Sequence, residues 1–177
     1  MTTPDRFPAT SRLLHWGMAV LILMMLFIGI GMVTSPGGYH RLVSIHRPLG
    51  VTILVLAAIR LVNRQIRPPP PLPSAMPAPL KLAAQASHVA LYGLMIALPL
   101  VGWAMLSAGA YPVLLFGGVA LPPIAPHDAR LYATLRGTHT VLALLLFATF
   151  LLHLSAALAH ATIFRDGVFE SMAGSFR

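Results

Sequence analysis

The chain has 177 residues, of which 57% are apolar and only 9% are charged. A soluble domain needs many more charged residues to cover its surface, so this composition excludes an ordinary soluble protein and indicates membrane spans. The absence of cysteine excludes thiolate metal sites, iron–sulfur clusters, covalently attached haem and disulfides. The formal charge is +8. Its basic residues stand between apolar runs, where they set topology, so we expect no nucleic-acid partner.

Four apolar runs are long enough to cross a bilayer, which takes about 20 helical residues. They cover residues 13–33, 45–62, 84–106 and 132–164. The first run is too long for the core of a signal peptide, so we expect it to remain as a span. The pattern predicts an all-α integral membrane four-helix bundle, built as a single domain over residues 1–177 in contact with membrane lipid.

The connections support these boundaries. Residues 34–38 form a turn cluster, and residues 68–79 form a proline-rich linker that is expected to be extended. Residues 108–130 are apolar but broken by glycine and proline, so we expect a loop on the membrane surface and not a fifth span. Pro99 is expected to kink the third span. Arg60 interrupts the end of the second span and is expected to extend to the interface.

The distribution of basic residues predicts the orientation. With the N-terminus inside, eight basic residues are cytoplasmic and four are outside. The inner set is Arg6, Arg12, Arg60, Arg64, Arg67, Lys81, Arg165 and Arg177, and the outer set is Arg41, Arg47, Arg130 and Arg136. Both termini are therefore predicted to be cytoplasmic. The four acidic residues all lie outside the spans, so no intramembrane carboxylate suggests a proton relay.

Two of the eight histidines share one face of the last span. His139 and His153 are fourteen residues apart, which is almost four helical turns at about 100° per residue. At 1.5 Å per residue they are roughly 21 Å apart along the axis. This spacing suits two haems stacked across the membrane, because imidazole is an ordinary axial ligand of haem iron.

Each iron then needs a second ligand at matching depth on another helix. His15 lies at the inner end of the first span, as His153 does in the last, while His46 begins the second span on the outer side, near the depth of His139. Depth therefore pairs His15 with His153 and His46 with His139. Ionisable side chains inside a membrane are costly and usually functional, although a lone histidine in a span can be structural.

Other candidates are less defined. His88 begins the third span at the inner side, where it is a rival ligand, a propionate partner or part of a quinone pocket. His160 lies seven residues beyond His153 on the same face, placed for a propionate or a quinone carbonyl, or simply solvated. Arg12 is a candidate propionate or quinone contact. His40 and His127 are expected in outer loops, exposed.

Several stretches resemble the bacterial cytochrome b561 family, in order along nearly the whole chain. They are Ser11–Trp16, His46 with Gly50 and the run to Arg60, His88 through Pro99, and Arg136–His139 through His153 to His160. All four proposed ligands match positions that carry the family's ligands. Within the family, the chain is most similar to the superoxide oxidases.

The resemblance implies two haems b in a bacterial inner-membrane protein that oxidises superoxide at the periplasmic face and delivers electrons to ubiquinone. It implies no required protein partner, and no protein base for oxidation, since superoxide only loses an electron; no catalytic residue is assigned. The alternative is a cytochrome b subunit that links a periplasmic dehydrogenase or hydrogenase to the quinone pool. A non-redox membrane module, such as a small transporter, would lack haem absorbance.

Overall fold

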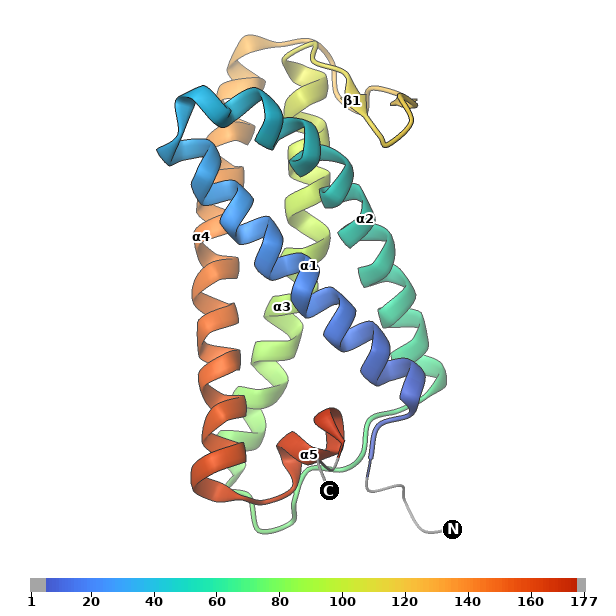
Figure 1. Cartoon of the computed structure of the whole chain (residues 1–177), viewed down its shortest axis with the longest axis vertical. Coiled ribbons are helices and arrows are strands. Elements are labelled where there is room, and N and C mark those ends of the chain that lie inside the picture. Colours follow the sequence, from blue (N-terminus) through green and yellow to red (C-terminus); the bar gives the residue numbers. More distant parts are fainter. Residues whose placement is uncertain (1–5, 175–177) are drawn as a thin grey trace.

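Four long helices dominate the structure, a computed structural model that describes residues 6–174 (Figure 1). They are α1 (Ala9–Thr34), α2 (Tyr39–Ile66), α3 (Ala78–Ala108) and α4 (Ala129–Ala159), which continues as the π-helical segment η2 (His160–Phe164). All four are long and apolar enough to cross a membrane. The predicted all-α membrane four-helix bundle is therefore confirmed.

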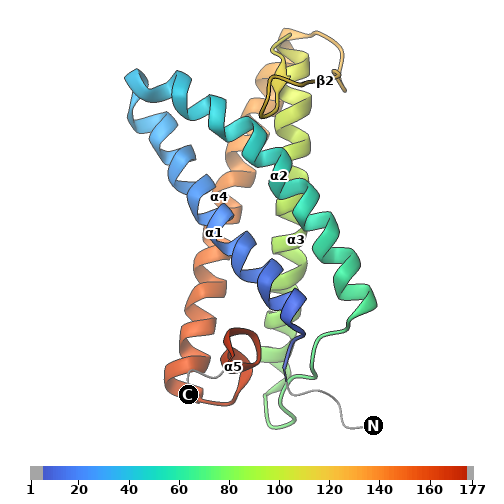
Figure 2. The same ribbon diagram turned by 45° about the vertical axis from the view of Figure 1, so that its right-hand side comes forward.

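The two ends of the bundle differ in how they are closed (Figures 1 and 2). At one end, called here the α5 end, α1 and α3 begin, α2 ends, and η2 leads into the short helix α5 (Val168–Ala173). The opposite end, the hairpin end, carries the turn η1 (Pro36–Gly38) and an antiparallel pair of strands, β1 (Val113–Leu114) and β2 (Ala120–Leu121). Between α3 and α4 the chain thus forms a hairpin and no fifth spanning helix.

The helices pack as neighbours in sequence. α1 lies along α2, α3 lies along α4, and α2 touches α3 less extensively. The pairs α1 with α4 and α2 with α4 are not among the closely packed ones. Space for a flat ligand can therefore open between α4 and the first two helices without separating packed neighbours.

Some boundaries differ from those that the apolar runs predicted. α2 begins at Tyr39 and not at residue 45, so His40 lies on its first turn and not in a loop. α3 begins at Ala78, which places Pro79 in the first turn, where its missing N–H costs nothing. α5 was not predicted; it is bounded by Gly167 and Gly174, both with positive φ, a conformation that glycine adopts without strain.

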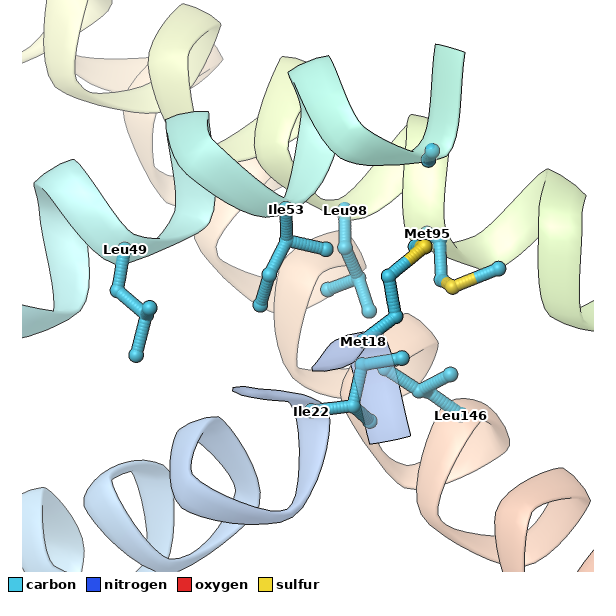
Figure 3. Close-up of a cluster of buried hydrophobic side chains, with 8 residues drawn as sticks. Met18, Ile22, Leu49, Ile53, Met95, Leu98 and Leu146 are labelled. Carbon is cyan, nitrogen blue, oxygen red and sulfur yellow. The ribbon is translucent and has the colours of Figure 1, made fainter. Parts of the chain in front are cut away.

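The core draws on all four helices (Figure 3). Its buried residues are Met18 and Ile22 of α1, Leu49, Ile53 and Ala57 of α2, Met95 and Leu98 of α3, and Leu146 of α4. Leu146 is seven residues from each of the α4 histidines, so this cluster fills the bundle between their two levels. The outer helix faces are also apolar, with residues such as Val33 at 83% and Val89 at 73% exposure. Those faces suit lipid chains.

Candidate functional site

The structure brings His46 of α2 and His139 of α4 together near the hairpin end. Their ring centres are 6.1 Å apart. An imidazole nitrogen binds a metal at about 2 Å and the ring centre lies roughly 1.1 Å behind it, so two rings on opposite sides of one iron have centres about 6 Å apart. The observed separation matches this requirement. Ligation itself stays a prediction.

A cavity lies between these two histidines. Its empty volume is about 570 Å³, partly open to the surroundings, and the other lining residues are almost all apolar. Gly50 of α2 and Pro99 of α3 are among them, and Pro99 sits within a helix that continues to Ala108. Cofactor pockets in proteins have mostly apolar walls. The lining of this cavity thus suits a largely apolar macrocycle.

Two details at the hairpin end are compatible with a ligand at these histidines. The Nδ1 atom of His46 is buried without a hydrogen-bond partner, and buried polar groups are rarely left so. Gly102 of α3 faces His139: a Cβ atom there would lie 3.4 Å from both Cδ2 and Nε2 of the ring. The absence of a side chain at Gly102 leaves the Nε2 face of His139 open. The residues therefore fit a haem b.

Near the α5 end three histidines meet. The ring centres of His15 on α1 and His153 on α4 are 6.3 Å apart, again close to the separation that one shared metal requires. His88 on α3 lies closer, with its ring centre 5.5 Å from that of His153. Distance alone does not exclude His88, but packing favours His15. A macrocycle between His88 and His153 would have to separate α3 from α4, whereas α1 and α4 are not closely packed.

Arg60 lies beside this second pair. Its Nη2 is 2.8 Å from Nδ1 of His15, and its guanidinium carbon is 5.8 Å from the ring centre of Tyr92. Arg60, which was expected to extend to the interface, has His15 and Tyr92 as partners within the bundle. Arginine only donates hydrogen bonds, so Nδ1 of His15 accepts. For Nε2 of His15 to become a ligand, Nδ1 must carry the ring proton, and Arg60 must release it.

His160 is the first residue of the π-helical segment η2. Its Nδ1 is 2.8 Å from Oδ2 of Asp166. π-helical turns often occur at functional sites, and here the wide turn is followed by Arg165 in the left-handed region, which brings Asp166 back toward the ring. The pair fixes the orientation of the His160 ring, and no hydrogen bond among the described residues uses its Nε2.

α5 is held against α1 at this end. Trp16 donates from Nε1 to the carbonyl of Met172 at 3.3 Å, and the N–H of Phe7 donates to the carbonyl of Ser171 at 3.1 Å. The guanidinium of Arg12 lies against Gly174, where a Cβ atom would be 2.9 Å from its Nη1. Arg12 therefore lies beside the end of α5, and no contact in residues 6–174 ties it to the histidine cluster.

A small open recess with mixed polar and apolar walls lies where α1, α2, α3 and α5 approach one another. It is lined by Phe7, Ser11, Arg60, Asn63, Arg64, Arg67, Pro69, Tyr92 and Met172. Asn63 donates to Ser11 at 2.8 Å, which joins the last turns of α2 to the first turns of α1.

The sequence patterns did not assign a role to Asp166 or Tyr92. Asp166 follows His160 by six residues, a spacing that brings side chains together only because the helix widens and then reverses. Arg60 did carry a signal, a charge inside an apolar run. His40 and His127 are both exposed, as expected.

The comparisons with known proteins agree with this architecture. The family described as prokaryotic cytochrome b561 matches residues 6–175. Cytochrome b561 homolog 2 of Escherichia coli (strain K12) is 34% identical over 177 residues, covering 97% of this chain and 93% of that protein. A probable superoxide oxidase, CybB of Yersinia pestis, is 30% identical over 165 residues and 90% of each chain. The chain therefore belongs to the prokaryotic cytochrome b561 family of electron-transferring membrane cytochromes b.

Proposed function

We propose that this chain is a di-haem cytochrome b of the bacterial inner membrane that transfers electrons from superoxide to ubiquinone. The observation that carries the proposal is the pair of histidine sites at two depths. His46 with His139 and His15 with His153 both have ring centres about 6 Å apart, and both join helices that are not close neighbours. When bound, haem iron with two imidazole ligands supplies one-electron transfer.

The residues between the two sites support electron transfer across the membrane. The core cluster defined above is apolar and excludes water from the space between the histidine levels. It also fixes the four helices relative to one another, because well-packed side chains leave little freedom. The histidines are therefore expected to move little when an electron is gained or lost.

The hairpin end suits an anionic substrate. Arg41, Arg130 and Arg136 are exposed there, and Arg47 donates to the carbonyl of Pro112 at 3.2 Å. The one acidic residue of that end, Asp128, caps α4 by accepting from the N–H of Leu131 at 2.7 Å. An excess of positive charge raises the encounter rate with anions. The 30% identical relative named as a probable superoxide oxidase supports superoxide as that anion.

The α5 end suits the quinone. Two superoxide anions each lose one electron and leave as oxygen, and ubiquinone takes up both electrons and two protons to form ubiquinol. His160 can pass protons at this end, because Asp166 holds its ring in place and imidazole can both accept and donate a proton. This assignment places the α5 end and both termini in the cytoplasm, in line with the distribution of basic residues.

The proposal is tested on the purified protein by mixing it with a pulse of superoxide and following haem absorbance. We expect fast reduction of a b-type spectrum, steady turnover with a short-chain ubiquinone, and loss of both signals when superoxide dismutase is present. Haem that stays oxidised after the pulse would contradict superoxide as donor and favour a subunit that takes electrons from a partner dehydrogenase. A colourless protein would contradict any haem function.

The ligands are tested by a matched pair of variants at the α5 end. His15→Ala is expected to lower the haem content from two to one per chain, whereas His88→Ala is expected to keep two. The opposite result would show that His88 is the ligand and that α3 and α4 separate to hold the cofactor.

A further inference from the structure

Arg60 is a full positive charge inside the bundle, in contact with a proposed ligand. Its Nη2 is 2.8 Å from the ring of His15, and it lies over the ring of Tyr92. The side chain is half-buried. Arginine stays protonated in proteins, so this charge is permanent.

Within the part of the chain that the structure describes, no carboxylate is paired with Arg60. Among residues 6–174, the one side-chain ion pair is that of His160 with Asp166. Tyr92 offers a ring face and a phenol, and His15 offers a neutral nitrogen, so the partners of Arg60 orient the charge without cancelling it. When His15 binds metal and Arg60 releases Nδ1, Tyr92 still holds the guanidinium beside the same ring.

At the hairpin-end pair Arg47 lies near His46, but within residues 6–174 no arginine contacts either ligand ring. Arg47 is adjacent to His46 in sequence, but its guanidinium is directed to the carbonyl of Pro112 in the hairpin loop. Among the described residues, no arginine is hydrogen-bonded to His46 or His139. The two sites are thus similar in ring geometry, and they differ in that an arginine is in direct contact with a ligand ring at the α5 end.

We propose that Arg60 raises the reduction potential of the haem held by His15 and His153 above that of the haem held by His46 and His139. This inference rests on the proposed function, which places those two cofactors. Reduction lowers the charge at an iron by one, and a nearby cation in a low-dielectric interior stabilises the reduced form. Arg60 thus makes the α5-end haem the better electron acceptor. Electrons therefore move from the hairpin-end haem toward the quinone end.

The test is a spectroscopic redox titration of the intact protein and of Arg60→Gln, Arg60→Lys and Arg67→Gln. Arg60→Gln keeps a hydrogen-bond donor but removes the charge, and Arg60→Lys keeps the charge. Arg67→Gln is the matched control, because Arg67 is exposed directly after the end of the same helix and its side chain bonds only Thr10 in the described contacts. The His139→Ala variant, with a single haem, assigns the potential of the α5-end site.

We expect Arg60→Gln to lower the reduction potential of the α5-end haem by about 59 mV or more. For one electron, this is a tenfold change in the equilibrium constant for reduction. The other haem should be unchanged, and Arg60→Lys and Arg67→Gln should both resemble the wild type. An unchanged potential in Arg60→Gln with two haems bound would overturn the inference and leave the proposed function intact. Loss of the α5-end haem in Arg60→Gln would also overturn it, in favour of a role in holding the cofactor. A wild-type protein with fewer than two haems would instead refute the proposed function.

Discussion

Gly102 of α3 faces the ring of His139, and replacing it with valine tests whether that ring face receives the cofactor. A Cβ atom at this position would lie 3.4 Å from both Nε2 and Cδ2 of His139. That distance alone is tolerable. The two γ-methyl groups of valine extend further, into the space that a metal on Nε2 and its macrocycle would occupy.

The expected magnitude follows from the cost of overpacking. Inserting extra methyl groups into a filled site costs about 1–3 kcal/mol. This corresponds to roughly 5- to 150-fold weaker binding of the haem at the hairpin end. Gly102→Ala adds only the Cβ atom, so its haem binding at the hairpin end is expected to weaken about fivefold or less. The haem at the α5 end should be unaffected, since the core cluster lies between the two sites.

The measurement is the haem content per chain after purification, with the redox spectrum of the haem that remains. Gly93→Val is the matched control: Gly93 is on the same helix, is exposed, and a Cβ atom there would meet nothing within 4 Å. We expect about one haem in Gly102→Val and two in Gly93→Val. Full occupancy with an unchanged spectrum in Gly102→Val would refute the placement of the cofactor against Nε2 of His139.

Three further outcomes are expected. His139→Ala should remove one haem while His40→Ala removes none, because His40 is exposed on the first turn of α2. The number of haems per chain is measured with the pyridine haemochrome assay. Asp166→Asn should slow ubiquinone reduction several-fold while haem reduction by superoxide stays at the wild-type rate, because only proton delivery through His160 is weakened; equal slowing of both steps would contradict that role. The rate of haem reduction by superoxide should fall as salt is raised, and Arg136→Gln should flatten this dependence; a rate independent of salt would argue against electrostatic attraction at the hairpin end.

The transmembrane architecture was predictable because it depends on local properties of the chain. Apolar runs of sufficient length must form helices in a membrane, since every backbone N–H and C=O has to be paired there. The fourteen-residue spacing of His139 and His153 likewise fixes a common face, because a helix is regular. Helix ends were less predictable: α2 extends six residues further toward its start than the apolar run, because a three-residue 3₁₀ turn reverses the chain.

The neighbours of each histidine were not predictable from local properties. His15 and His88 have similar depths, so sequence spacing cannot rank them as partners of His153. The ranking depends on which helices are in contact, and α3 packs against α4 while α1 packs against α2. Similarly, the meeting of His160 with Asp166 depends on the π-helical turn and the left-handed Arg165 that follows it.

The amino-acid sequence by itself therefore determined that four helices cross the membrane and that histidines stand at two depths, because hydrophobicity and helical period act along a single segment. Only the tertiary structure decided which rings face each other, and that Arg60 contacts His15 and Tyr92. These choices depend on the lateral order of the helices, and that order is set by side-chain packing between segments far apart in the chain.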